Sequence, residues 1–191
     1  NTKYDPGQKN NIINENKDIA NEMQKFYDDW WEEASKEFKY SYIDIYPNIT
    51  NTITAHDVLV NSITAWDQSV IREGIPYELG KFNVDFKKSG EYEITLRRWP
   101  KESNLNLRDG IDDFIPAKKY WDQQSSGKSM NIVSAYIKIG DKEYKVDLSD
   151  NLKTASINID INSGKTSLEP GFTLDNGQTS IAFYTDIDFL Y

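Results

Sequence analysis

The chain has 191 residues, a formal net charge of −9 and no cysteine. The lack of cysteine excludes disulfides, zinc–thiolate sites and iron–sulfur clusters. The negative charge, without a basic stripe, argues against binding to a phosphate backbone, so we expect no nucleic-acid partner. No apolar run is long enough for a membrane span. The chain starts at Asn1 rather than at a methionine, and we expect it to be part of a longer protein.

The N-terminal part predicts a polar lead-in followed by an amphipathic helix. Asn16 is a good N-cap residue, and apolar residues then recur at spacings of three and four. This stripe consists of Ile19, Met23, Phe26, Trp30, Ala34 and Phe38. We expect the stripe to be buried, with Trp30 as a structural anchor, and the acidic opposite face to be solvated rather than metal-binding. Residues 1–40 therefore form a lead-in and helical arm.

From residue 41 onward the pattern is that of short strands separated by turn residues. Strands are expected at 42–46, 82–86, 92–96, 133–139, 144–148, 157–161 and 181–189. The runs around Lys88-Ser89-Gly90 predict one β-hairpin, and those around Gly140-Asp141 predict a second. Residues 48–74 are expected to hold a strand, a loop and a helical turn, and 101–128 a long connection. The fold class is mainly β: an antiparallel, jelly-roll-like β-sandwich over residues 41–191, preceded by one N-terminal amphipathic α-helix.

Two adjacent arginines follow the first predicted hairpin. The period of two places Arg98 in line with the apolar Tyr92, Ile94 and Leu96, and places Arg97 with Trp99 on the other face. A buried guanidinium needs a carboxylate or several carbonyl groups, so we expect Arg98 to sit at the end of the core against such partners or to line a ligand pocket.

Catalytic and metal-binding patterns are weak. His56 is the one histidine, which rules out a two-histidine metal site. The adjacent Asp57 would point to the opposite side of an extended chain, so the two do not form a ready dyad. The sequence Ser126-Gly127-Lys128-Ser129 lacks the first glycine of a phosphate-binding loop. We expect no catalytic residue and no metal site in this chain.

A series of ordered motifs resembles the C-terminal part of bacterial arylsulfatase-type sulfatases. The motifs are Asp5-Pro6-Gly7-Gln8, Asn16-Lys17-Asp18-Ile19, Ile53-Thr54-Ala55-His56-Asp57, Trp66-Asp67-Gln68, Gly80-Lys81-Phe82, Gly90-Glu91-Tyr92 and Leu96-Arg97-Arg98-Trp99-Pro100. The resemblance covers residues 5 to about 102. Gln8 stands where the family usually has an acid, and Val58 where it often has tryptophan.

The resemblance implies a non-catalytic role for this chain. In that family a Cys or Ser two residues before a proline becomes formylglycine, and calcium is bound in the same catalytic domain. Here the prolines are preceded at that distance by Tyr4, Ile45, Gly74, Arg98, Phe114 and Leu168. The chain would then be a sulfatase C-terminal domain that packs on its own catalytic domain and helps shape the substrate pocket for a sulfated carbohydrate or aryl sulfate.

The resemblance also suggests roles for individual residues and a cellular setting. His56, Trp66, Arg97 and Trp99 would face the substrate or the partner domain, whereas Asp57 and Arg98 would be structural anchors. The setting would be periplasmic or secreted, and a sulfated glycan is a possible ligand.

The alternative is a free-standing carbohydrate-binding module of the jelly-roll type. Coplanar aromatic side chains on one concave sheet face would favour this module, whereas aromatic residues buried under the N-terminal helix would favour the sulfatase domain. An enzyme in its own right would need a cleft that holds His56 and paired carboxylates.

Overall fold

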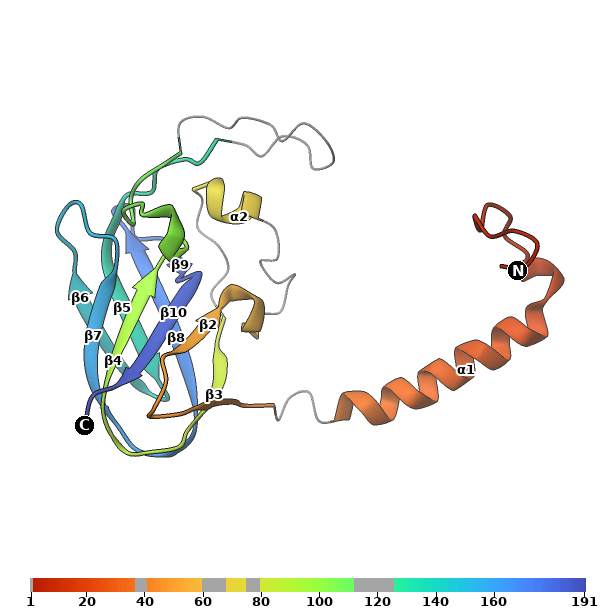
Figure 1. Cartoon of the computed structure of the whole chain (residues 1–191), viewed down its shortest axis with the longest axis horizontal. Helices are drawn as coiled ribbons and strands as arrows, with labels where there is room; N and C mark the ends of the chain where they lie inside the picture. The colour runs from red at the N-terminus through yellow and green to blue at the C-terminus, as the bar shows by residue number, and fades with distance from the viewer. Residues whose placement is uncertain (1, 37–40, 60–67, 75–79, 112–125) are drawn as a thin grey trace. The chain divides into compact units, whose positions relative to one another are not determined.

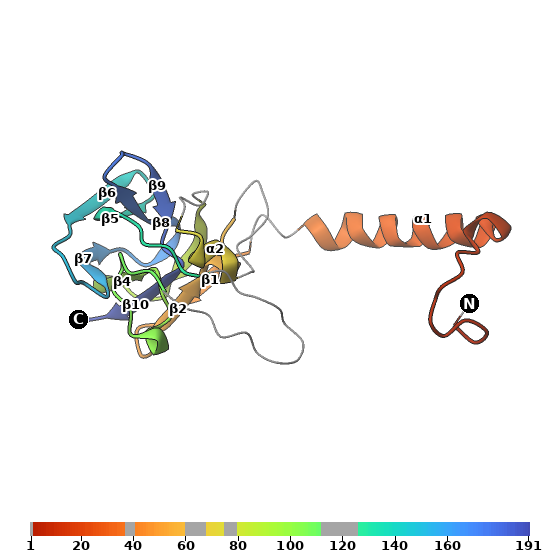
Figure 2. The same ribbon diagram turned by 90° about the horizontal axis from the view of Figure 1, so that it is seen from above.

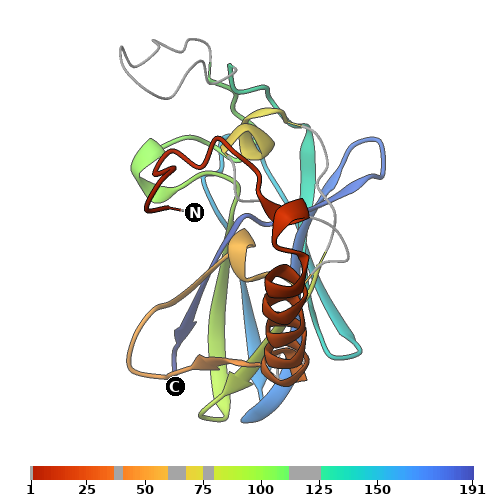
Figure 3. The same ribbon diagram turned by 90° about the vertical axis from the view of Figure 1, so that its right-hand side faces the viewer.

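A computed structural model describes residues 2–36, 41–59, 68–74, 80–111 and 126–191. The chain divides into two compact units, Asn1–Ser41 and Tyr42–Tyr191, which are treated separately below. The first unit contains the short 3₁₀ turn η1 (Ile13–Glu15) and the helix α1 (Lys17–Ala34). The second contains two β-sheets, and Figures 1 to 3 show it from three sides.

The second unit is a β-sandwich, which confirms the predicted fold class. Its strands are β1 (Ile43–Ile45), β2 (Asn51–Thr54), β3 (Phe82–Phe86), β4 (Gly90–Arg97), β5 (Ile132–Ile139), β6 (Lys142–Asp147), β7 (Ala155–Ile161), β8 (Gly164–Leu174), β9 (Thr179–Ile181) and β10 (Tyr184–Phe189). Within the described residues, one sheet has the order β1-β3-β8-β5-β6 with β9 beside β8, and the other has the order β2-β10-β4-β7. All pairs are antiparallel except β1 and β3.

The predicted hairpin at residues 82–96 is wrong. β3 pairs with β1 and β8, whereas β4 pairs with β10 and β7 in the other sheet. The chain therefore crosses between the sheets at residues 87–89, and the rings of Phe86 and Tyr92 meet edge to face with centroids 5.0 Å apart. Gly90 has φ +150°, and a Cβ there would lie 2.4 Å from the Tyr191 carbonyl oxygen. Alternation identified each strand and its buried face, but not its partner.

Several other predicted strands are present in the structure. β1 and β7 form where expected, and β5 and β6 pair as the predicted second hairpin. The run at 181–189 is not one strand, because β9 and β10 belong to different sheets. β8 was not predicted, although it lies at the centre of the larger sheet. Its Pro170 and Gly171 break the usual signature of a central strand.

The core lies between the two sheets and consists of the inward residues of each strand. On β4, for example, Tyr92, Ile94 and Leu96 have 0% exposed surface. The facing sheet contributes Phe82, Val84 and Phe86, again at alternate positions and at most 1% exposed. This pattern holds the strands in register, because a shift by one residue would turn every apolar side chain toward water.

Within its own unit the α1 stripe has no cover, so its burial stays a prediction. No residue of α1 is buried, and Phe26, Met23 and Trp30 are 75%, 68% and 54% exposed. The role of Trp30 as a structural anchor likewise stays a prediction, and Phe38 lies outside the described residues. Tyr27 stacks on Trp31 with an interplanar angle of 7°. The spacing identified an apolar face but could not say what covers it. None of the described helices could cross a membrane.

Candidate functional site

The candidate site lies at the end of the sandwich where β2, β4 and β6 end and β3, β5, β7 and β10 begin (Figure 1). We call this the loop end. The described segments there are the 3₁₀ turn η3 (Ala55–Asp57), the short helix α2 (Gln68–Arg72), the segment 98–111 with the turn η4 (Lys101–Ser103), residues 126–131 and the β6–β7 loop. Single backbone hydrogen bonds join some of these segments, such as that from the Lys128 amide to the Arg72 carbonyl at 2.7 Å. Other carbonyl groups there lie outside any strand ladder and need side-chain donors.

Arg98 holds three of these segments together. Its side chain is 1% exposed. The guanidinium donates to the carbonyl oxygens of Asp109 at 3.0 Å, Ile71 at 2.9 Å and Lys128 at 2.7 Å. Burial lowers the pKa of Arg98 to about 10, against the opposing effect of the Asp109 charge, so the group stays positive at neutral pH. Arg98 thus joins α2 to the segments around residues 109 and 128.

Arg97 is also buried, contrary to the expectation that it faces a surface. It is 5% exposed, and its Nη2 donates to both carboxylate oxygens of Asp186 at 2.9 and 2.8 Å. The strand register pairs Arg97 with Tyr184 and Thr95 with Asp186, so Asp186 is the diagonal neighbour of Arg97 on the outer face of the sheet. Sequence periodicity had placed Arg97 on the correct face, but the neighbouring strand supplies a carboxylate that pairs with it.

Asp186 has further partners. Thr52 Oγ1 donates to it at 2.7 Å, and Lys101 Nζ lies 3.0 Å from it. Burial raises the pKa of Asp186, but the hydrogen bonds from Thr52 and Lys101 and the charge of Arg97 outweigh burial, and the pKa lies below its ordinary value. This network fixes the start of β10 and the first turn of η4 beside the loop end.

A cavity of about 170 Å³ lies next to the Arg98 interactions. We call it the Trp99 pocket; it is lined by Gln68, Ile71, Arg72, Trp99, Pro100, Ser103, Ile111 and Tyr184. Trp99 is 5% exposed, and its ring lies 4.3 Å from the Arg98 guanidinium. Among the described residues, the indole Nε1 has no hydrogen-bond partner. The pocket therefore combines aromatic and aliphatic walls with a few polar groups.

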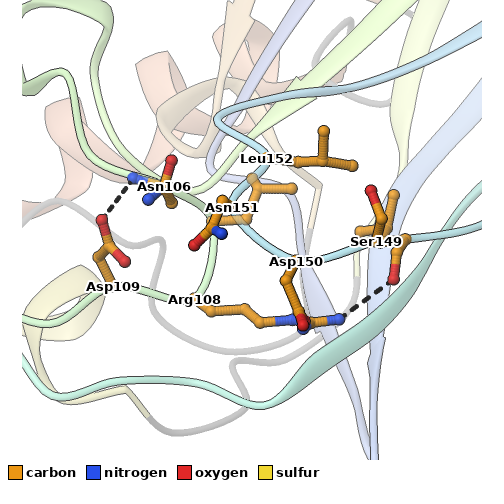
Figure 4. Close-up of a pocket in the computed structure, with 9 residues that line it drawn as sticks. Asn106, Arg108, Asp109, Ser149, Asp150, Asn151 and Leu152 are labelled. Carbon is orange, nitrogen blue, oxygen red and sulfur yellow. Dashed lines mark hydrogen bonds and ion pairs between the residues drawn. The ribbon is translucent and has the colours of Figure 1, made fainter.

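A second cavity, of about 230 Å³, lies at the same end of the sandwich (Figure 4). We call it the Asn151 pocket; it is lined by Asn106, Leu107, Arg108, Asp109, Leu148, Ser149, Asp150, Asn151 and Leu152. In Figure 4, Asn106 and Asp109 lie on one side of it and Ser149 on the other. Two segments form it, and they are joined by the hydrogen bond from the Leu107 amide to the Leu152 carbonyl at 2.7 Å.

The Asn151 pocket has a fixed frame and free polar groups. Arg108 donates to the carbonyls of Ile132 and Leu148 and pairs with Asp150. The backbone amide of Asn106 donates to the Asp109 carboxylate at 2.8 Å. In the described part of the chain, the side chains of Asn106, Ser149 and Asn151 make no hydrogen bond. These groups are available to a ligand that carries hydroxyl groups.

The other predicted site residues do not gather at either pocket. His56 lies exposed in η3, and Asp57 accepts hydrogen bonds from the amide and the hydroxyl of Thr54 at 3.0 and 3.1 Å. Asp57 therefore caps its own turn. Trp66 lies outside the described residues. Of the four residues expected to face a substrate or partner, the structure places Trp99 at a pocket.

Sequence reasoning missed Tyr184 and the whole Asn151 pocket. The alternation of the last strand could have placed Tyr184 on the outer face, because Thr185 and Ile187 point inward. No signal could have brought Asn106 and Asn151 together, because they come from separate loops with no regular pattern. In the described residues, no group of three or more His, Asp or Glu side chains could hold a metal ion.

The described sheets do not present a row of exposed aromatic side chains. Tyr136 on the outer face of the larger sheet is only 6% exposed, and its ring fills the space above Gly171. Tyr184 is the aromatic residue on the outer face of the smaller sheet, at its loop end. The large exposed aromatic group is found on α1 instead.

Comparisons with known proteins give distant structural likenesses. No family model matches the chain, and no curated protein matches it. One similar structure is the CBM35 from Cellvibrio japonicus Abf62, with 16% identity over 57% of this chain and 63% of that chain, and a TM-score of 0.33. Another is a ruminal GH26 endo-beta-1,4-mannanase, with 14% identity over 77% of this chain and 27% of that chain, and a TM-score of 0.38. The chain spans less than two thirds of either structure. At these TM-scores the likenesses carry no argument about the site.

Proposed function

We propose that the chain is a carbohydrate-binding module that receives a sugar ring in the Trp99 pocket. The pocket itself is the observation that supports this function. Trp99 and Tyr184 offer aromatic surfaces to the C–H face of a sugar, and Gln68 and Ser103 offer polar groups to its hydroxyls.

The charges around the pocket bear on the choice of sugar. Arg72 is the charged residue among those that line the Trp99 pocket. If the sugar carries a sulfate or a carboxylate, we expect that group to face Arg72. The chain as a whole has a net charge of −9, which disfavours a polyanionic glycan spread over the wider surface. A neutral or singly substituted sugar fits these features best.

The test is a glycan array with neutral and sulfated oligosaccharides, followed by calorimetry on the glycans that bind. We expect Tyr184→Ala and Gln68→Ala each to weaken binding by about tenfold or more, since each removes a wall or a donor from the pocket. Asn158→Ala on the outer face of β7, where the residue is exposed, is the matched control and should leave affinity unchanged. If no carbohydrate binds at millimolar concentration, the proposal fails.

A second candidate is the C-terminal domain of a sulfatase, and the exposed face of α1 favours it. Ile19, Met23, Phe26 and Trp30 present an apolar stripe that a partner protein could cover. Within Lys17–Ala34 there are six acidic residues and two lysines, a net charge of 2 − 6 = −4. The expected partner surface is an apolar groove with basic residues at its rim.

In this second function the partner would be the chain's own catalytic domain. That domain would hold the formylglycine and the calcium and act on a sulfated carbohydrate or aryl sulfate, while the present chain would be non-catalytic. A periplasmic or secreted setting would follow. The residues encoded before Asn1 in the natural gene test the idea first, because they should contain a Cys or Ser two positions before a proline.

The docking role can then be measured directly. The catalytic domain from that gene, expressed separately, should bind the 191-residue chain, and Phe26→Ala with Trp30→Ala should weaken this binding by about a hundredfold or more. Lys25→Ala is the matched control, since Lys25 lies in the same helix and pairs with Asp29 one turn further along it. Full binding by the double variant would contradict the docking role.

A further inference from the structure

We propose that the ligand is an oligosaccharide that occupies the Trp99 pocket and the Asn151 pocket together. This inference rests on the proposed carbohydrate-binding function and adds the length of the ligand and the chemistry of its second unit. The Trp99 pocket would hold one sugar ring against aromatic side chains. The Asn151 pocket would hold a neighbouring, uncharged unit through hydrogen bonds to its hydroxyl groups.

The two pockets adjoin along one stretch of chain. Pro100, Ser103 and Ile111 line the Trp99 pocket, whereas Asn106 to Asp109 line the Asn151 pocket. Asp109 and Ile111 are two residues apart, so their Cα atoms are at most about 7 Å from each other. The residues that line both pockets come from segments at the loop end. A ligand that extends out of one pocket along this segment would enter the other.

A single residue holds the walls of both pockets in position. Arg98 donates to the carbonyl of Ile71, which lines the Trp99 pocket, and to the carbonyl of Asp109, which lines the Asn151 pocket. The two walls therefore cannot move independently while these hydrogen bonds are formed. A fixed spacing between two subsites favours a ligand with a matching repeat, because little ordering is needed on binding.

The second pocket has the chemistry of a hydroxyl-binding site. The side chains of Asn106, Ser149 and Asn151 offer both donors and acceptors, and within the described residues none of them is engaged. The charged side chains of this pocket are Arg108, Asp109 and Asp150, a net charge of 1 − 2 = −1, and Arg108 is already paired with Asp150, so an anionic substituent is disfavoured there. The unit bound there is therefore an uncharged sugar, and any acidic group belongs beside Arg72 in the other pocket.

Chain length gives the test a clear readout. A single sugar can fill one pocket only, whereas an oligosaccharide can fill both. The probes are oligosaccharides of one to six units, built from the sugar that binds on the array and titrated into the full 191-residue chain by calorimetry. We expect affinity to rise by about tenfold or more between one unit and the length that spans both pockets, and then to level off.

Variants of the Asn151 pocket separate the two subsites. Asn151 has φ +62°, a conformation that glycine adopts freely, so Asn151→Gly removes the amide without strain in the backbone. We expect Asn151→Gly and Asn106→Ala to lower the affinity for the long oligosaccharide by about tenfold and to leave single-sugar binding unchanged. Asn158→Ala should change neither, and thermal melts should show that all variants are folded.

Three outcomes of these titrations separate the two-pocket ligand from the single-sugar function. A rise in affinity with length that is lost in Asn151→Gly supports the two-pocket ligand. Binding that does not depend on length, or that Asn151→Gly leaves intact for long chains, overturns it while the single-sugar function stands. If no glycan of any length binds, the proposed function fails, and the two-pocket ligand fails with it.

Discussion

Replacing Arg98 with methionine should destabilise the sandwich strongly. The guanidinium makes three hydrogen bonds of 2.7 to 3.0 Å to the carbonyls of Asp109, Ile71 and Lys128. Hydrogen bonds to a charged group contribute about 1.5 to 3 kcal/mol each, so three sum to at most about 9 kcal/mol. Relief of the cost of burying the charge offsets part of this sum. We therefore expect a net loss of about 3 to 5 kcal/mol, a large fraction of a domain's stability.

Urea unfolding followed by circular dichroism measures this loss. Arg98→Lys keeps a positive charge but not the planar fork, and its stability should lie between wild type and Arg98→Met. Lys138→Met on the outer face of β5 is the control, because Lys138 makes only a surface ion pair of 3.5 Å with Glu143. The control should stay within about 0.5 kcal/mol of wild type. A loss below about 1 kcal/mol for Arg98→Met would show that the three carbonyls are satisfied without the guanidinium.

Two further predictions concern buried groups away from Arg98. The pKa of Asp186 is lowered from 3.8 in the folded state, so its contribution to stability is present above that value and is lost as the pH falls through and below it. Asp186→Asn should remove this acid-dependent step. It should also lower the free energy of unfolding by about 3 to 5 kcal/mol at neutral pH, since Arg97 is left buried without its carboxylate. If the free energy of unfolding falls in parallel for wild type and Asp186→Asn as the pH is lowered, the prediction is contradicted. Gly171→Ala should cost about 1 to 3 kcal/mol, because the new Cβ would lie 2.5 Å from the Tyr136 ring, whereas Gly7→Ala should have no effect on the melting temperature.

The sequence predicted strands well and their partners unevenly. Alternation placed β4 and β7 with the correct faces buried, since a period of two follows from the pleat itself. The hairpin of β5 and β6 was also correct, because two residues in a tight turn force the strands together. The same logic failed for β3 and β4, where the linking residues carry the chain to the opposite sheet. Pairing there is decided by β8 and β10, whose paired residues come 78 to 97 positions later in the chain (164 − 86 = 78 and 189 − 92 = 97).

The site was harder to predict than the fold. Periodicity placed Arg98 toward the core, and a guanidinium in that position demanded several acceptors, which the structure supplies as three carbonyls. The pockets themselves are assembled from loops that share no periodic pattern and are distant in sequence. The apolar stripe of α1 shows the opposite problem. Its pattern was clear, but a pattern carries no information about whether the cover comes from the same chain.

Arg98 explains how irregular loops at the end of a sandwich can form a defined site. Among the described residues Arg98 makes no ion pair, and the Asp109 charge offsets only part of the cost of burying the guanidinium. Methionine or leucine at this position would suit a hydrophobic core better. The carbonyls of residues 71, 109 and 128, however, lie beyond the strand ladders and need donors. The guanidinium supplies these donors from a single side chain. It therefore fixes the walls of both pockets without a bound ligand, as hydrogen bonds between strands fix the sheets.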